Sequence, residues 1–186
     1  MTQLPAARVK VWDRAVRLLH WTLVLAVALA WISTEWGGGA HQPAGYVALA
    51  AVLLRAAWGL GRSGSGGYAR FAQFVRGPRR TLHYAVQVLQ HREPRHVGHN
   101  PLGGWMVLAL MGCVAGLGLT GWAYTSDWLW GDARVEALHI GLAWTLLGLA
   151  ALHVAGVVFT SRRHRENLLR AMLDGRKRAP RGSDVA

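Results

Sequence analysis

The stretch His139–His153, HIGLAWTLLGLAALH, decides the fold. Its two histidines enclose thirteen almost wholly apolar residues, inside a longer apolar block over about residues 135–160. About 20 apolar residues are enough for a helix to cross a bilayer at about 1.5 Å rise per residue, so we predict a transmembrane helix here. Ionisable side chains are costly inside a membrane and usually serve a function there. The two histidines therefore need an explanation.

Three further apolar blocks precede this one, over about residues 13–34, 43–61 and 101–122, and Arg55 interrupts the second. Lys and Arg are frequent before the first block, after the second and after the fourth, and rare in the other two links. Cytoplasmic loops are enriched in Lys and Arg, so this alternation predicts four spans with both termini in the cytoplasm. We expect an all-α integral membrane four-helix bundle, one domain over residues 1–186 with a basic cytoplasmic tail at 161–186.

The net charge of +12 follows from this topology. We attribute it to orientation in the membrane and to attraction for anionic lipid, and we expect no binding to nucleic acid. The only cysteine, Cys113, lies in the third block, which excludes an internal disulfide and a cysteine metal cluster. Gly112 and Gly116 in the same block are spaced for close helix packing.

The link between the second and third blocks contains PRRTLHYAVQVLQHRE, residues 78–93. Leu82, Val86 and Leu89 repeat there at helical spacing among basic residues. This pattern predicts an amphipathic helix on the inner membrane surface. An ordinary cytoplasmic connector would account for the same pattern equally well.

The nine histidines fall into two groups. Five belong to the basic segments, where solvated side chains are expected: His83, His91, His96, His99 and His164. The others lie in the spans, with His20 and His153 near the inner ends and His41 and His139 near the outer ends. Fourteen residues of α-helix make about 3.9 turns and about 21 Å, so His139 and His153 share a face without being able to share one ligand. Two ligands stacked across the bilayer would use both.

The inner ligand would take His20 and His153, and the outer ligand His41 and His139. Arg55 follows His41 by fourteen residues, so we expect it on the same helix face at the inner level, where it needs an anionic partner. Paired imidazoles, a flat apolar ligand in a bundle core and acidic groups that bind arginine together describe haem b with bis-histidine ligation. An iron with both axial positions occupied is suited to electron transfer.

Other uses of membrane histidines are known. They form hydrogen bonds between helices, and imidazole also binds zinc, copper and iron, so a transition-metal transporter is an alternative. Proton pathways usually string acidic groups together, and we expect a transport site to include carboxylates or thiolates. No Asp or Glu lies in the interior of a predicted span, which favours haem.

Four segments carry a resemblance to a known family: VWDRAVRLLHW at residues 11–21, HQPAGYVALAAVLLRAAWG at 41–59, GHNPLGGWMVLAL at 98–110, and the Leu-His pairs that end at His139 and His153. Over about residues 8–173 the chain resembles the bacterial di-haem cytochromes b, which comprise the cytochrome b561 type and the cytochrome b subunits of nickel–iron hydrogenases. The resemblance implies two b haems in a four-helix bundle, with His20, His41, His139 and His153 as ligands.

The resemblance also implies a function in the bacterial inner membrane. Electrons would pass between the quinone pool and a redox partner of a respiratory chain, either a soluble periplasmic carrier such as a cytochrome c or a membrane oxidoreductase subunit. Two alternatives stay open: a haem-bearing membrane anchor of a larger enzyme such as a hydrogenase, and a quinone-dependent oxidase that acts on a small molecule such as superoxide. These alternatives differ in whether the chain is an enzyme by itself.

Overall fold

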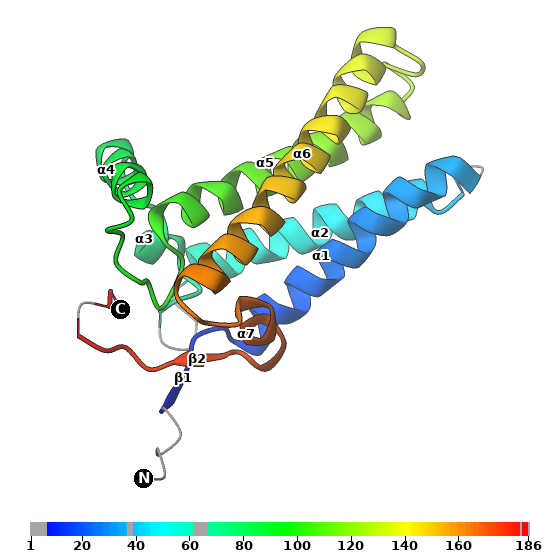
Figure 1. Cartoon of the computed structure of the whole chain (residues 1–186). Helices are drawn as coiled ribbons and strands as arrows, with labels where there is room; N and C mark the ends of the chain where they lie inside the picture. Colours follow the sequence, from blue (N-terminus) through cyan, green and yellow to red (C-terminus); the bar gives the residue numbers. More distant parts are fainter. Residues whose placement is uncertain (1–6, 37–38, 62–66, 183, 186) are drawn as a thin grey trace. The chain divides into compact units, whose positions relative to one another are not determined.

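The computed structural model describes residues 7–36, 39–61, 67–182 and 184–185 of the chain. Helices dominate this part of the chain, accompanied by two short paired strands (Figure 1). In chain order the elements are β1 (Arg8–Lys10), α1 (Arg14–Ser33), the 3-10 turn η1 (Thr34–Trp36), α2 (His41–Leu60), α3 (Phe71–Phe74), α4 (Pro78–Leu89), α5 (Pro101–Tyr124), α6 (Ala133–Arg163), α7 (Leu168–Asp174) and β2 (Arg176–Arg178). Residues 1–6 and 186, for which a cytoplasmic location is predicted, lie outside the described residues.

Among the described residues, four helices are long and apolar enough to cross a membrane: α1 with its η1 extension, α2, α5 and α6. They coincide with the four predicted spans, and the prediction of an all-α membrane helix bundle is confirmed. Helix α6 ends at Arg163, three residues beyond the predicted block. The prediction followed the apolar residues alone, whereas the helix continues through the polar residues after them. The amphipathic segment also forms the predicted helix, α4.

The first residues of two spans are held by side-chain caps. Asp13 precedes α1, and its Oδ1 accepts a hydrogen bond from the backbone N–H of Val16 at 2.7 Å. Its Oδ2 accepts a second one from the indole Nε1 of Trp58 at 2.9 Å. Asn100 caps α5 in the same way, with the N–H of Gly103 at 2.7 Å from its Oδ1. These caps satisfy N–H groups that the start of a helix leaves without a partner.

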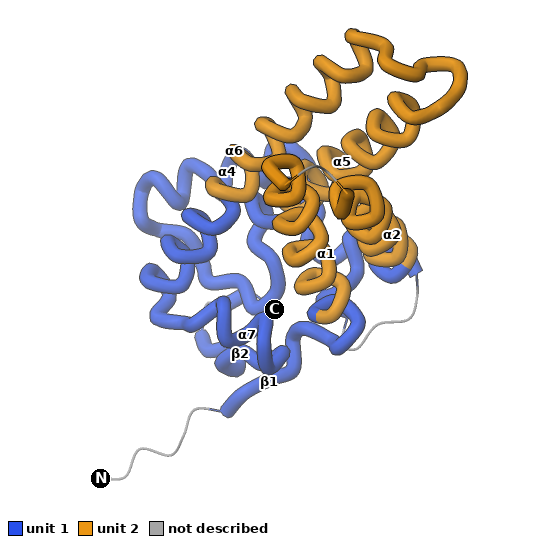
Figure 2. Tube along the Cα trace, turned by 90° about the vertical axis from the view of Figure 1, so that its right-hand side faces the viewer, with its two compact units in different colours: residues 1–17, 58–106, 153–186 blue, residues 18–57, 107–152 orange. Residues whose placement is uncertain are grey.

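The chain divides into two compact units, shown in different colours in Figure 2. Unit 1 contains residues 1–17, 58–106 and 153–186, and unit 2 contains residues 18–57 and 107–152. Unit 2 therefore holds most of the span residues, while unit 1 holds one end of each span with the links and terminal segments attached to it.

Small side chains allow the helices of unit 2 to approach one another. A Cβ at Gly118 would lie 2.9 Å from Leu49, and one at Gly116 would lie 3.1 Å from Leu142. Around these contacts a core forms from all four spans: Ala26, Ala48, Val52, Cys113, Val114 and Leu146. Close packing is confirmed at Gly116 but is wrong for Gly112, where a Cβ would meet no described atom within 4 Å.

Unit 1 is built on long-range pairing between the two ends of the chain. Strands β1 and β2 are antiparallel, with Val9 opposite Lys177. Helix α7 ends at Gly175, whose φ of 78° lies in the left-handed region that favours glycine. The Gly175 carbonyl then accepts the N–H groups of Val11 at 2.8 Å and Trp12 at 3.1 Å. Part of the segment predicted as a basic tail is therefore folded against the N-terminal residues, since β2 pairs with β1.

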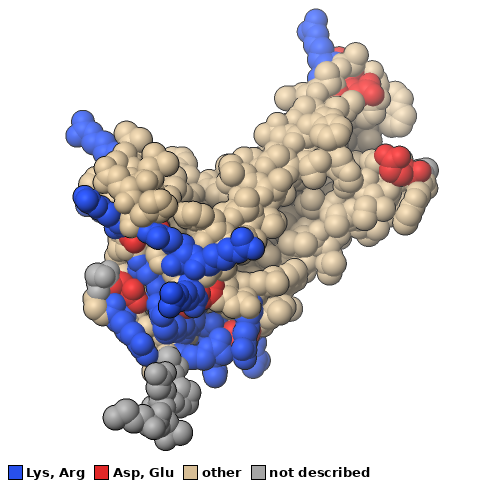
Figure 3. All heavy atoms as spheres, viewed as in Figure 1, with Lys and Arg blue, Asp and Glu red and all other residues tan. Residues whose placement is uncertain are grey.

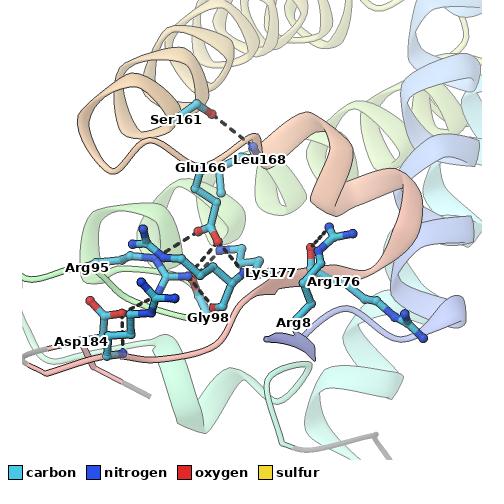
Figure 4. A network of polar contacts seen from close by, with 11 residues as sticks. Arg8, Arg95, Gly98, Ser161, Glu166, Leu168, Arg176, Lys177 and Asp184 are labelled. Atoms are coloured by element: carbon cyan, nitrogen blue, oxygen red, sulfur yellow. Dashed lines mark hydrogen bonds and ion pairs between the residues drawn. The ribbon is translucent and has the colours of Figure 1, made fainter. Parts of the chain in front are cut away.

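Arg95 is the centre of a polar network that fastens the C-terminal segment (Figure 4). Its side chain is 4% exposed and donates to Glu166 at 2.7 Å, to Asp184 at 2.6 Å and to the Arg178 carbonyl at 2.8 Å. The backbone continues the same attachment, since Val97 N–H donates to the Val185 carbonyl at 2.8 Å. Fully buried arginines are rare unless paired, and here two carboxylates provide the pairing.

Charge is divided unevenly between the two units. Unit 1 contains 19 of the 21 Lys and Arg residues, and unit 2 contains Arg55 and Arg134. In Figure 3 the blue side chains gather over unit 1, whereas unit 2 is mostly tan with red side chains near the tips of its helical hairpins. The acidic residues of unit 2 are Glu35, Asp127, Asp132 and Glu136.

Candidate functional site

All four predicted ligand histidines lie on spanning helices with half-buried side chains. On α6, protected residues recur every three or four positions and include Val135, His139, Leu142, Leu146, Leu149 and His153. The two histidines of the opening stretch therefore share the protected stripe of one continuous helix. Arg55 lies on the equivalent stripe of α2, which begins at His41.

The outer pair comes together within unit 2. The ring centroids of His41 and His139 are 5.9 Å apart, and the two rings are inclined by 64°. His41 is the first residue of α2, and His139 is in the second turn of α6, so the start of one span meets the start of another. The structure thus places side by side two imidazoles that are 98 residues apart in the sequence.

His41 is oriented by the end of α1. Its Nδ1 lies 2.9 Å from the carbonyl oxygen of Ala30. Ala30 is in the last four residues of that helix, and its carbonyl also accepts a hydrogen bond from the Ser33 hydroxyl at 3.1 Å. A carbonyl can only accept, so Nδ1 carries the hydrogen. The neutral ring then has its lone pair on Nε2, which is the nitrogen available to a metal.

His139 is oriented by Thr120 of α5. The Thr120 hydroxyl oxygen lies 2.9 Å from Nδ1 of His139 and 2.8 Å from the carbonyl of Gly116. A hydroxyl has one hydrogen, which it donates to the Gly116 carbonyl, so its oxygen accepts the N–H of the histidine. Here too the lone pair is on Nε2. Gly121 leaves room for the ring, since a Cβ there would lie 3.3 Å from Cε1 of His139.

The donor set of this predicted outer pair fits a haem iron. Imidazole nitrogen is a standard ligand of haem iron, and two imidazoles come together here with their ring centroids 5.9 Å apart. Metal-bound histidines also donate their second N–H to a carbonyl or similar acceptor, as both rings do here. Within the described residues, no three His, Cys, Asp or Glu side chains gather as a protein-only metal site would require.

The inner residues lie in different units. His20 belongs to unit 2 and packs edge-on against Trp21, with ring centroids 5.2 Å apart. Arg55 also belongs to unit 2, whereas His153 belongs to unit 1. Each is half-buried on its own helix. Their assignment to an inner ligand therefore remains a prediction.

Two histidines of the basic link are not the solvated side chains that the sequence suggests. His99 lies between Trp12 and Phe74, with ring centroids 4.6 Å and 4.5 Å away. His96 packs edge-on against Tyr84 at 5.1 Å, and burial lowers its pKa despite a hydrogen bond to the Pro94 carbonyl. The prediction of solvation is wrong here because the link folds back on the N-terminal residues.

A buried lysine completes this aromatic cluster in unit 1. The ammonium of Lys177 lies 5.4 Å from the centre of the Trp12 ring and 3.4 Å from the Gly98 carbonyl oxygen. Burial lowers the pKa of Lys177 to about 8, although the nearby charge of Glu166 acts in the opposite direction. The cation is thus held by a ring face and a carbonyl.

Thr120 and the Ala30 carbonyl are the two site groups that sequence reasoning missed. Threonine is common in membrane helices, and nothing local connects position 120 with a histidine nineteen residues later. The signal that could have found it is position, because Thr120 lies near the end of α5 and His139 near the start of α6, on the two sides of one short link.

Comparison with known proteins identifies the family of the chain. The sequence model of the family described as prokaryotic cytochrome b561 matches residues 11–175. Neither the curated proteins nor the solved structures include a match to the chain. The family match covers all four spans and helix α7. The chain therefore belongs to the prokaryotic cytochrome b561 family, a family of membrane electron-transfer proteins that carry haem b.

Proposed function

We propose that the protein carries two b haems, each held by two histidines, and that it moves electrons between the quinone pool and a redox partner of a respiratory chain. His41 and His139 would hold the outer haem, and His20 and His153 the inner one. The observation that carries the proposal is the outer pair, where two imidazoles lie 5.9 Å apart and each has its Nδ1 engaged by an acceptor.

The residues of the chain would do three things for these haems. Bound haem b supplies a one-electron centre. His41 and His139 would hold the outer haem through Nε2, while the Ala30 carbonyl and the Thr120 hydroxyl keep the two rings in the required tautomer and orientation. The half-buried guanidinium of Arg55 would pair with an acidic group of the inner haem. The apolar helices provide the low-dielectric surroundings that help to set the haem potentials.

The charge pattern supports an orientation in the bacterial inner membrane. Unit 1, with 19 of the 21 Lys and Arg residues, would face the cytoplasm together with both termini. The hairpin tips of unit 2, which carry four acidic residues and Arg134, would face the periplasm. Their acidity suits a basic soluble electron carrier as the partner. The family match across 11–175 supports treating the chain as one membrane cytochrome domain.

The first test is a haem count. The purified protein is expected to give a reduced-minus-oxidised spectrum of b type and two haems per chain by the pyridine haemochrome assay. Quinol added to the oxidised protein should reduce the haem. A count of one haem per chain would contradict the proposal of two haem sites. A protein purified without haem absorbance would favour the transporter alternative instead.

Thr120→Val is expected to weaken binding of the outer haem roughly 10–100-fold. This is the usual loss of affinity when a residue that is hydrogen-bonded to a metal ligand is removed. Valine keeps the shape of threonine but cannot accept the Nδ1 hydrogen of His139. Thr120→Ser keeps the hydroxyl and should bind haem like the unchanged protein. The measurement is haem retention against increasing amounts of a competing haem-binding protein. Equal retention by the valine and serine variants would show that the hydrogen bond has no part in haem binding.

A further inference from the structure

Helix α4 presents three distinct faces. Successive residues of an α-helix are rotated by about 100°, so Leu82, Val86 and Leu89 lie on one side. Their side chains are 68%, 42% and 80% exposed. The polar side carries Arg79, Arg80, His83 and Gln87, and the third side carries Tyr84 and Val88. Exposed apolar patches usually mark an interaction surface. An apolar helix face with a basic face beside it is typical of a helix that lies on a membrane.

The third face attaches α4 to the rest of unit 1. Tyr84 is 5% exposed and packs edge-on against His96 at a ring-centroid distance of 5.1 Å. Burial raises the pKa of the Tyr84 hydroxyl to about 12, and a hydrogen bond with the Asn100 side chain acts against this rise. Protein contacts thus account for one face of α4 and leave the Leu82 face open.

A tryptophan of span α5 is hydrogen-bonded to the residues at the start of α4. The indole Nε1 of Trp105 donates to the Arg76 carbonyl at 3.0 Å and to the Thr81 hydroxyl at 3.2 Å. Trp105 is in the second turn of α5 and is 44% exposed. Tryptophans at span ends sit at the level of the lipid headgroups. The first turn of α4 is therefore tied to a side chain at that level.

We infer that α4 lies in the headgroup region of the membrane, with Leu82, Val86 and Leu89 inserted among the lipid chains. Arg79 and His83 border this apolar face, on its water-facing side, where they would meet anionic phosphates. Two observations favour a phospholipid surface over another protein as the partner of this face. Basic side chains border it, and the start of α4 is hydrogen-bonded to Trp105 near the end of a span. Of the two sequence-based interpretations of this segment, the inference selects the amphipathic surface helix over the plain connector.

The test measures which solvent each face meets. Cys113, which is buried, is replaced by alanine, and one cysteine at a time is introduced for a fluorescent label in the full-length holoprotein. Leu82→Cys and Val86→Cys report on the apolar face. His83→Cys and Gln90→Cys, both at exposed polar positions, are the matched controls. Each variant is placed in nanodiscs of phosphatidylcholine and phosphatidylglycerol and exposed to iodide in the water or to nitroxide-labelled lipid.

At positions 82 and 86 we expect quenching by lipid nitroxide to exceed quenching by iodide several-fold, and the reverse at positions 83 and 90. Iodide quenching at 82 and 86 as strong as at the controls would overturn the inference by showing a water-exposed connector. Protection from both quenchers would also overturn it, because another protein chain would then cover the face. The result does not depend on the haem ligands, so it can fail while the proposed function holds.

Discussion

His41→Ala and His153→Ala are each expected to leave one haem per chain instead of two, and the two variants should lose different haems. Each substitution leaves one iron with a single protein ligand. Losing a ligand lowers the haem affinity by more than the roughly 10–100-fold that follows from losing a hydrogen-bond partner of a ligand. The measurement combines the pyridine haemochrome count with a potentiometric titration, in which each variant should retain a different spectral component.

His83→Ala is the matched control, because His83 is exposed on α4 and outside the spans. It should keep both haems. If His41→Ala and His153→Ala removed the same component, the pairing by depth would be wrong even though haem is bound. If neither reduced the count, the ligands would be other residues.

Arg95→Met is expected to reduce the free energy of unfolding by about 3–5 kcal/mol, because it removes the positive charge that pairs with two carboxylates of unit 1. Arg95 is 4% exposed on its side chain and bridges Glu166 and Asp184 at 2.7 Å and 2.6 Å. The measurement is the thermal midpoint of the detergent-solubilised holoprotein. A chain of this size loses roughly 2–4 °C per kcal/mol. Arg79→Met, at an exposed arginine of α4, should change the midpoint little.

The ion pairs of Arg95 with Glu166 and Asp184 also predict that the stability of the protein depends on pH. Burial alone would raise the pKa of Glu166, but hydrogen bonds from Arg95 and the Arg178 N–H lower it overall. Burial likewise opposes, without overcoming, the lowering of the Asp184 pKa by the Arg181 N–H and by Arg95. A carboxyl with a lowered pKa in the folded state stabilises it above the unfolded pKa, near 4, and this stabilisation is lost as the pH falls further.

The difference between the unchanged protein and Arg95→Met should therefore be full at neutral pH and shrink below about pH 4. A midpoint for Arg95→Met equal to that of Arg79→Met would show that the ion pairs do not hold the C-terminal segment. A difference that stayed constant down to acidic pH would mean that the loss comes from packing of the arginine side chain and not from its charge.

The sequence by itself determined the spans, because burying four long apolar blocks in a bilayer is a property of each block alone. It also separated the histidines in the spans from those in the links, since depth follows from position along a helix of known rise. The family resemblance drawn from residues such as His20, His41, His139 and His153 was confirmed at the level of the family by the match over 11–175. The ligand assignments remain predictions.

Only the tertiary structure decided which groups meet. Thr120 reaches His139 across nineteen residues, and the Ala30 carbonyl reaches His41 across eleven, through helix ends whose relative rotation no local pattern specifies. The sequence predicts only a basic C-terminal tail, whereas in the structure β2 pairs with β1 and Arg8 contacts Asp174 across 166 positions. The physical reason is the same in each case. A hydrogen bond or ion pair depends on ångström-scale placement of two distant segments, whereas membrane insertion depends only on the composition of one.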